Sequence, residues 1–186
     1  KDVWSYKYDN YPVEIKQQSL KNMMRTSDRY YRMQSVLLGD NIAEIQNRYD
    51  IFLKDYDLTR MVKTAEDPKY LTRLESQNLV SEEKAEIYRK IIESDLWASF
   101  KSDYTQLQKK AEKVFNEKTE MRIFTYENEE MEKDTVMTPM DSIKYLRMIL
   151  QVGSVAMNPS NGHVKAWVGG VNHKYFQYDH VYANRQ

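Results

Sequence analysis

Apolar positions recur every three to four residues through the first two thirds of the chain, the period of an amphipathic helix. Between residues 42 and 56 we expect one helix face to carry Ile42, Ile45, Tyr49, Phe52, Leu53 and Tyr56. A second stripe runs through Ile87, Tyr88, Ile91, Ile92, Leu96, Phe100, Tyr104, Leu107, Ala111, Val114 and Phe115. We expect a bend in this second stripe near Lys101 and Ser102. Both stripes predict helices that bury one face against a core.

Local signals divide these helices. Asp67-Pro68 marks a break, and Tyr70, Leu71 and Leu74 predict a short helix after it. Ser81 is a favourable first residue for a further helix, because its hydroxyl can accept a backbone N–H bond. The acidic residues that follow Ser81 lie near the positive end of the helix dipole.

The pattern changes from Thr119 onward. Met121–Tyr126 alternates as a strand does, the acidic run Glu127–Asp134 predicts a loop, and Asp134–Met137 predicts a second short strand. A helix over residues 138–151 follows, with Thr138 as its cap, Pro139 at its first position and Asp141 completing a capping box. We expect its buried face to consist of Ile143, Leu146, Ile149 and Leu150.

Two further strands, Ser154–Met157 and His163–Val168, flank the turn sequence Asn158-Pro-Ser-Asn-Gly162. We expect Asn161 and Gly162 to supply the positive φ angles of a tight hairpin. Val164, Ala166 and Val168 alternate with Lys165 and Trp167, which is typical of a half-buried strand. The double glycine Gly169-Gly170 would let the chain turn sharply away from the sheet.

The fold class predicted from these patterns is α+β. A mainly helical portion, residues 1–118, is followed by a small antiparallel sheet with one packed helix, residues 119–186. The chain has 28 basic and 28 acidic residues among 186, so no overall field favours nucleic acid or an anionic membrane as a partner. No apolar run reaches the ~20 residues of a membrane helix. The absence of Cys excludes disulfides and thiol chemistry.

Candidate chemistry is sparse. His163, His173 and His180, with Asp179 beside the last, do not share a helix face, so isolated loop and strand histidines are the favoured interpretation over a metal site. The acidic run lacks the spacing and central glycine of a calcium loop. Neither Ser81 nor Ser154 has His and Asp partners at a suitable spacing. We therefore assign no catalytic residue, no cofactor-binding residue, no metal ligand and no cofactor to this chain.

Residues 137–186, MTPMDSIKYLRMILQVGSVAMNPSNGHVKAWVGGVNHKYFQYDHVYANRQ, are similar to one family. The segment resembles the start of the transpeptidase domain of class A, bifunctional penicillin-binding proteins. In that family a helix leads into a hairpin of the form A-x-D/N-P-x-x-G-x-V/I-x-A-x-V-G-G, then an aromatic-rich crossing, then R-Q-P-G-S-x-x-K. Ala156–Pro159 and Gly162–Gly170 match the hairpin, and Arg185-Gln186 match the start of the last motif. A weaker match extends back through Lys113–Asn116 and the Met121 strand.

The resemblance implies a parent enzyme that polymerises and crosslinks peptidoglycan, on the periplasmic side of a bacterial inner membrane. It implies a glycosyltransferase domain and a membrane anchor before Lys1, and a nucleophilic Ser with its Lys after Gln186. Tyr178-Asp179 stands where many members have Phe-Asn. Since the sequence lacks the nucleophile and the later S-x-N and K-T/S-G motifs, we expect this polypeptide alone neither to bind penicillin covalently nor to polymerise glycan.

Three roles remain open for the helical portion. It is a structural connector that sets the geometry between two active sites, an accessory module that docks a periplasmic regulator or glycan, or a spacer without specific contacts. Peptidoglycan or its precursors would reach the parent through its other domains. An exposed apolar or aromatic patch on the helices would favour docking over spacing.

Overall fold

The computed structural model describes residues 12–182, and Arg185-Gln186, the start of the expected catalytic motif, lie outside this range. The described part is α+β, as predicted. Its elements are α2 (Val13–Arg25), α3 (Asp28–Tyr49), α4 (Asp55–Glu66), α5 (Pro68–Ser76), α6 (Glu82–Glu93), α7 (Leu96–Asn116), β1 (Thr119–Phe124), β2 (Glu132–Met137), α8 (Pro139–Met148), β3 (Ser154–Met157) and β4 (Val164–Val168). None of the helices within residues 12–182 combines the length and apolar character that a membrane crossing requires.

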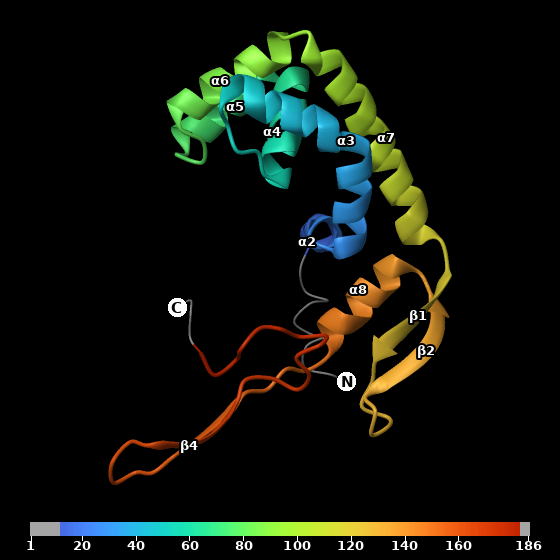
Figure 1. Ribbon diagram of the computed structural model, residues 1–186, viewed down its shortest axis with the longest axis vertical. Coiled ribbons are helices and arrows are strands. Elements are labelled where there is room, and N and C mark those ends of the chain that lie inside the picture. Colours follow the sequence, from blue (N-terminus) through green and yellow to red (C-terminus); the bar gives the residue numbers. More distant parts are fainter. Residues whose placement is uncertain (1–11, 183–186) are drawn as a thin grey trace. The chain divides into compact units, whose positions relative to one another are not determined.

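The chain forms two compact units. The helical unit comprises Lys21–Glu117, and the mixed unit comprises Lys1–Leu20 with Lys118–Gln186. Within the helical unit α3 and α7 lie side by side (Figure 1). They are antiparallel, because Tyr30 near the start of α3 bonds to Gln108 late in α7, whereas Arg48 near the end of α3 pairs with Asp95 just before α7.

The core of the helical unit consists of apolar and aromatic side chains from its long and short helices. Fully buried members are Tyr30, Leu38, Ile45, Leu58, Met61, Leu71, Tyr88, Ile91, Phe100, Leu107 and Phe115. Asp67 caps α5 by accepting from the Lys69 N–H at 3.1 Å, and Pro68 is its first residue. Ser81 caps α6 by accepting from the Lys84 N–H at 3.3 Å. Both predicted helix starts are therefore confirmed.

Two expectations about helix continuity are wrong. The stripe from residue 42 to 56 is divided, because α3 ends at Tyr49 and Asp50 adopts a left-handed conformation with φ 48°. Phe52 then lies in a non-helical link and is 72% exposed. The second stripe breaks at Ser94 and Asp95, between α6 and α7, and not near Lys101, where α7 is continuous. Aspartate tolerates the left-handed conformation better than most residues, which explains the stop at Asp50.

In the mixed unit β1 and β2 form an antiparallel pair with Thr119 opposite Met137 and Phe124 opposite Glu132. The second strand begins at Glu132, two residues before its predicted start, because the Thr125 N–H bonds to the Met131 carbonyl at 3.0 Å and tightens the loop. Ile123 and Phe124 at the end of β1 are both buried.

Helix α8 begins at Pro139 as predicted, with the Thr138 hydroxyl accepting from the Asp141 N–H at 3.0 Å. The Asp141 carboxylate accepts from the Thr138 hydroxyl at 2.7 Å, and not from the Thr138 N–H as the expected capping box requires. It ends at Met148 and not at residue 151. Ile149 is already extended and Leu150 is 56% exposed, while Ile143 and Leu146 are half-buried. The predicted buried face is therefore only partly buried, because its last two members lie beyond the helix.

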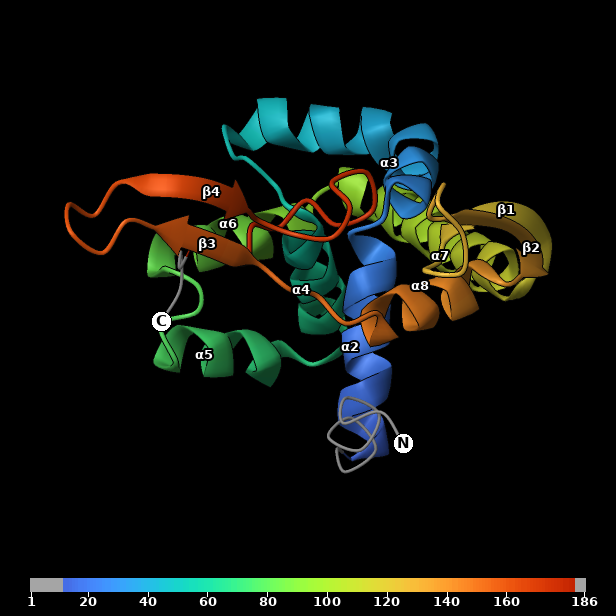
Figure 2. The ribbon, with the colours of Figure 1, turned by 90° about the horizontal axis from the view of Figure 1, so that it is seen from below.

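The last two strands, β3 and β4, form a ribbon of their own, so residues 119–182 contain two separate two-stranded sheets where one was expected (Figure 2). Every residue of both strands is exposed, Trp167 to 48%. The half-buried strand predicted from the alternation is therefore wrong for this chain, since no described element covers either face. Gly162 has φ 71°, whereas Asn161 is outside the positive region, so only one of the two expected turn residues supplies a positive φ.

Candidate functional site

The end of the β3–β4 ribbon is fastened by Asp179, and we call this arrangement the Asp179 clasp. The indole N–H of Trp167 donates to Asp179 Oδ2 at 2.8 Å. The other carboxylate oxygen accepts from the backbone N–H groups of Val181 at 2.9 Å and Tyr182 at 3.3 Å. The His180 N–H donates to the Gly169 carbonyl at 2.7 Å. These bonds hold the returning chain against the end of β4.

Two glycines allow residues 179–181 to approach the ribbon closely. A Cβ on Gly169 would lie 2.6 Å from Asp179 Cγ, and a Cβ on Gly153 would lie 2.9 Å from the Val181 side chain. A Cβ on Gly170 would meet no atom nearer than 3.6 Å. Among the described glycines only Gly162 has a positive φ. Gly169 is therefore required for close approach and not, as expected, for a sharp turn.

The carboxylate of the clasp is held ionised. The Trp167 indole N–H and, after it, the Val181 N–H lower the pKa of Asp179 below its ordinary value. Hydrogen bonds to a carboxylate favour its charged form. Sequence reasoning noted Asp179 beside His180 and as a departure from Phe-Asn, but gave it no role. The sequence signal for such a role is Trp167, two residues before Gly169-Gly170, combined with Asp179, ten residues after Gly169.

The aromatic residues between the clasp and the ribbon pack on the core of the mixed unit. Tyr175 and Phe176 approach the buried ring of Phe124, with centroid distances of 5.9 and 5.2 Å and edge-on geometry. Tyr126 lies 4.8 Å from the same ring, and its hydroxyl donates to the Leu150 carbonyl at 3.0 Å. This cluster joins the segment before the clasp to the β1–β2 sheet.

The three histidines belong to three different parts of the mixed unit. His163 follows the hairpin turn, and His173 belongs to the aromatic crossing. His180 packs edge-on against Tyr178 with a centroid distance of 5.0 Å. Within residues 12–182 no group of three or more His, Cys, Asp or Glu side chains could hold a metal ion.

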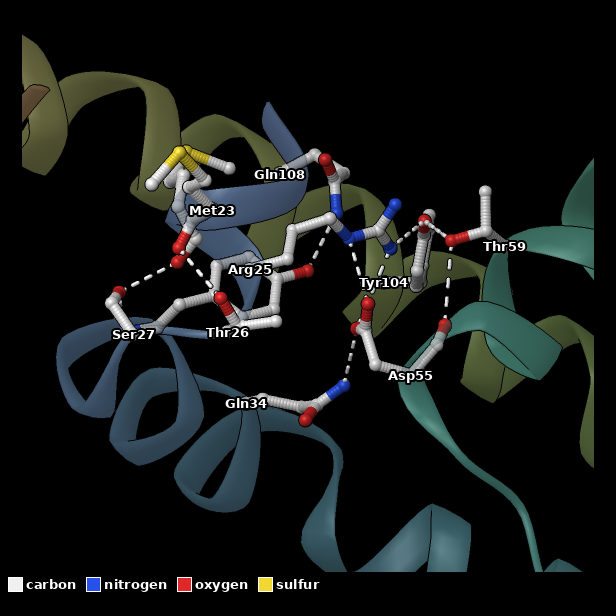
Figure 3. A network of polar contacts seen from close by, with 11 residues as sticks. Met23, Arg25, Thr26, Ser27, Gln34, Asp55, Thr59, Tyr104 and Gln108 are labelled. Carbon is white, nitrogen blue, oxygen red and sulfur yellow. Dashed lines mark hydrogen bonds and ion pairs between the residues drawn. The ribbon is translucent and has the colours of Figure 1, made fainter. Parts of the chain in front are cut away.

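A second polar cluster joins the last residue of α2, which lies in the helical unit, to three helices of that unit (Figure 3). Arg25, the last residue of α2, pairs with Asp55 at 2.9 Å and donates to the Tyr104 hydroxyl at 2.9 Å. Gln34 of α3 donates to Asp55 at 3.0 Å, and the Thr59 hydroxyl lies 3.3 Å from that of Tyr104. The cluster therefore bonds Arg25 to side chains of α4 and α7, and Gln34 of α3 to the same aspartate.

Electrostatics in this cluster reflect its burial. Desolvation raises the pKa of Asp55 above its ordinary value, although the nearby Arg25 opposes the shift. Burial also raises the pKa of Tyr30, whose hydroxyl accepts from the Gln108 side chain at 3.1 Å. Removing one partner would leave buried polar atoms unpaired, which costs more than the bond itself contributes.

The most deeply buried charge of the helical unit is Asp57, whose side chain is fully inaccessible. It accepts from the Tyr88 hydroxyl at 2.5 Å, from Lys84 Nζ at 3.0 Å and from the Lys54 N–H at 2.9 Å. Burial and then the bond to Asp57 raise the pKa of Tyr88 strongly, so the phenol stays protonated. A neutral tyrosine held in this way is a poor nucleophile or base. The bonds of Asp57 to Tyr88 and Lys84 join α4 to α6.

A segment of the chain is similar to a known protein family. Residues 72–150 match the family described as the penicillin-binding protein middle domain. No curated protein and no solved structure matches the chain. The matched segment begins in α5 and ends just after α8, so it includes parts of both units. Part of the chain is therefore similar to the middle domain of penicillin-binding proteins.

Proposed function

We propose that this chain links and positions the two catalytic domains of a class A, bifunctional peptidoglycan synthase. The observation that carries this proposal is the middle-domain match at residues 72–150. Five residues, 151–155, separate it from the hairpin Ala156–Gly170, which resembles the start of the transpeptidase domain. The parent enzyme would be anchored in the bacterial inner membrane with this region on its outer side. Its glycosyltransferase would precede the chain and its transpeptidase nucleophile would follow.

The internal bonding of the helical unit supports a positioning role. The antiparallel pair α3 and α7 and the cluster around Arg25 bring the first and last helices of this unit together. Such a packed layer holds its two ends at a fixed separation, which a flexible linker of equal length does not. The clasp would serve the same purpose in the mixed unit, where it holds Val181 and Tyr182 near the end of β4.

Penicillin labelling tests the family proposal. The whole natural protein should bind fluorescent penicillin covalently, with the adduct mapping by mass spectrometry to a serine three residues after Gln186. The 186-residue chain alone should not be labelled, because we assign it no nucleophile. An adduct on a residue within the chain, or a whole protein that resists labelling, would overturn the proposal.

A second function, docking of a periplasmic regulator, is favoured by one observation. Tyr56 is 48% exposed on α4, and the cationic groups of Lys54, Arg60 and Lys84 lie within 5.9 Å of its ring centre. A spacer without specific contacts has no need for cations gathered on an exposed aromatic side chain. The two functions are compatible, since positioning depends on buried bonds and docking on this surface.

A further inference from the structure

The turn of the β3–β4 ribbon contains an asparagine followed directly by a glycine, Asn161-Gly162. No other asparagine of the sequence precedes a glycine. Both residues are exposed, and a Cβ on Gly162 would meet nothing within 4 Å. Because glycine has no side chain, its backbone nitrogen is open to solvent and to the neighbouring asparagine side chain.

The Asn161 carboxamide is folded back over the Gly162 peptide. Its Oδ1 accepts from the His163 N–H at 3.1 Å, which is the bond of an Asx turn. This bond keeps the carboxamide carbon beside the Gly162 nitrogen, and such proximity replaces a bimolecular encounter. The His163 N–H also stabilises the negative charge that would develop on Oδ1 if a nucleophile attacked the carboxamide carbon. The turn therefore brings an electrophile and a nitrogen nucleophile together.

The neighbouring Asn158 makes the same kind of bond but lacks the nucleophile. Its Oδ1 accepts from the Ser160 N–H at 2.9 Å. The residue between them is Pro159, whose nitrogen carries no hydrogen and cannot form an amide anion. Asn158 is therefore an internal control in which the carboxamide is placed similarly and the attacking N–H is missing.

Asn172 provides a second internal comparison. Its Oδ1 accepts from the Lys174 N–H at 2.9 Å, again as an Asx turn. The following residue is His173, which has an N–H but also a Cβ that crowds its nitrogen. Of these three Asx turns, that of Asn161 is the one in which an unhindered N–H follows the asparagine.

We propose that Asn161 is a site of spontaneous covalent modification, with water as the co-reactant. The Gly162 nitrogen forms a bond to the Asn161 carboxamide carbon, and ammonia leaves with the proton that the nitrogen gave up. The product is a five-membered succinimide ring. Water then breaks one of its two C–N bonds: cleavage of the new bond gives aspartate, and cleavage of the original peptide bond gives isoaspartate. The reaction needs neither an oxidant nor a reductant.

The turn must open before the ring can close, because the Gly162 N–H donates to the Asn158 carbonyl at 2.9 Å. A two-stranded ribbon is marginally stable by itself, and exposed turns open at low free-energy cost. Either product adds one carboxylate, so 28 basic and 29 acidic residues would give a net charge of −1. Isoaspartate also lengthens the backbone of the turn by one carbon. The inference concerns the turn alone and is independent of the positioning role.

Peptide mapping of the incubated 186-residue chain by mass spectrometry, with fragmentation that separates aspartate from isoaspartate, tests the inference. Both products should accumulate at Asn161 about tenfold faster than at Asn172, and neither should form at Asn158. The rate should rise about tenfold per unit between about pH 7 and 9, because the deprotonated fraction of the amide rises in that proportion. Equal rates at Asn161 and Asn172, or aspartate without isoaspartate, would overturn the proposal.

Two variants test whether the glycine nitrogen is the nucleophile. Gly162→Asn should slow the reaction at Asn161 about tenfold. Its turn should persist, because Asn78 adopts φ 53° in this chain and a Cβ at position 162 has open space. His173→Gly is the converse change and should speed the reaction at Asn172. An undiminished rate at Asn161 in the first variant, or an unchanged rate at Asn172 in the second, would overturn the role given to the glycine. Neither assay involves penicillin, so failure here leaves the family proposal standing.

Discussion

Replacing Tyr88 by Phe removes one hydroxyl from the centre of the helical unit and changes little else. The Tyr88 side chain is fully buried, and its hydroxyl donates to the inaccessible Asp57 carboxylate at 2.5 Å. A hydrogen bond to a charged group contributes about 1.5–3 kcal/mol, and a buried acceptor that loses its donor costs free energy in addition. Lys84 and the Lys54 N–H still bond to the other carboxylate oxygen. We therefore expect the free energy of unfolding to fall by about 2–3 kcal/mol.

Urea unfolding followed by circular dichroism at 222 nm measures this change, because most of the described helices belong to the helical unit. Tyr49→Phe is the matched control, since its hydroxyl makes an exposed bond of 3.3 Å to the Lys90 carbonyl. We expect the control to change the free energy of unfolding by less than about 0.5 kcal/mol. Equal effects of the two variants, or a Tyr88→Phe protein as stable as the original, would refute the assigned importance of the buried bond.

The same variant has a pH signature. The folded pKa of Tyr88 is raised above its unfolded value of about 10. Its contribution to stability is therefore complete below pH ~10 and is lost as pH rises further, because the unfolded chain ionises first. The loss approaches about 1.4 kcal/mol per pH unit for one such group. Tyr88→Phe should flatten this decline between about pH 10 and 11, and an unchanged slope would contradict the raised pKa.

Two further predictions concern the clasp. Gly169→Ala should displace Asp179 and speed amide hydrogen exchange at Val181, because the new Cβ would lie 2.6 Å from the carboxylate carbon. Gly170→Ala is the control: its Cβ would meet no atom nearer than 3.6 Å, so amide exchange at Val181 should stay unchanged. Because the pKa of Asp179 is lowered, the clasp should be intact above the ordinary carboxyl pKa of about 3.9 and open as pH falls through the lower folded value. The indole N–H resonance of Trp167 should report this opening, and movement already at pH 5 would contradict it.

Sequence patterns predicted which helices and strands form better than they predicted the residues at which these elements end. The starts at Pro68, Ser81 and Thr138 followed from capping chemistry, which depends on two or three neighbouring residues. The stop at Asp50 was missed, because apolar periodicity continues through it and only the backbone conformation of one residue ends the helix. Apolar periodicity also predicted that Leu150 belongs to the buried face of α8, but the helix ends at Met148 and Leu150 is exposed.

The polar clusters were beyond what periodicity can indicate. Arg25, Asp55 and Tyr104 come from three different helices and are brought together only by the packing of the bundle. The same holds for Asp57 and Tyr88, which are 31 positions apart. Gly169 was singled out by sequence, but its reason, space for the Asp179 carboxylate, depends on a contact ten residues further along the chain. Alternation in β4 predicted burial, yet burial requires a covering element that alternation alone does not supply.

The most direct test of the positioning role replaces Lys21–Glu117 in the whole natural protein by a Gly/Ser linker of equal length. Crosslinking of nascent glycan from lipid-linked precursor would then be compared with penicillin labelling of the same samples. A positioning role predicts that labelling persists, because the transpeptidase site is intact, while crosslinking of newly made glycan falls sharply. Undiminished crosslinking in the protein with the flexible linker would contradict it and leave the helical unit as a spacer or a docking module.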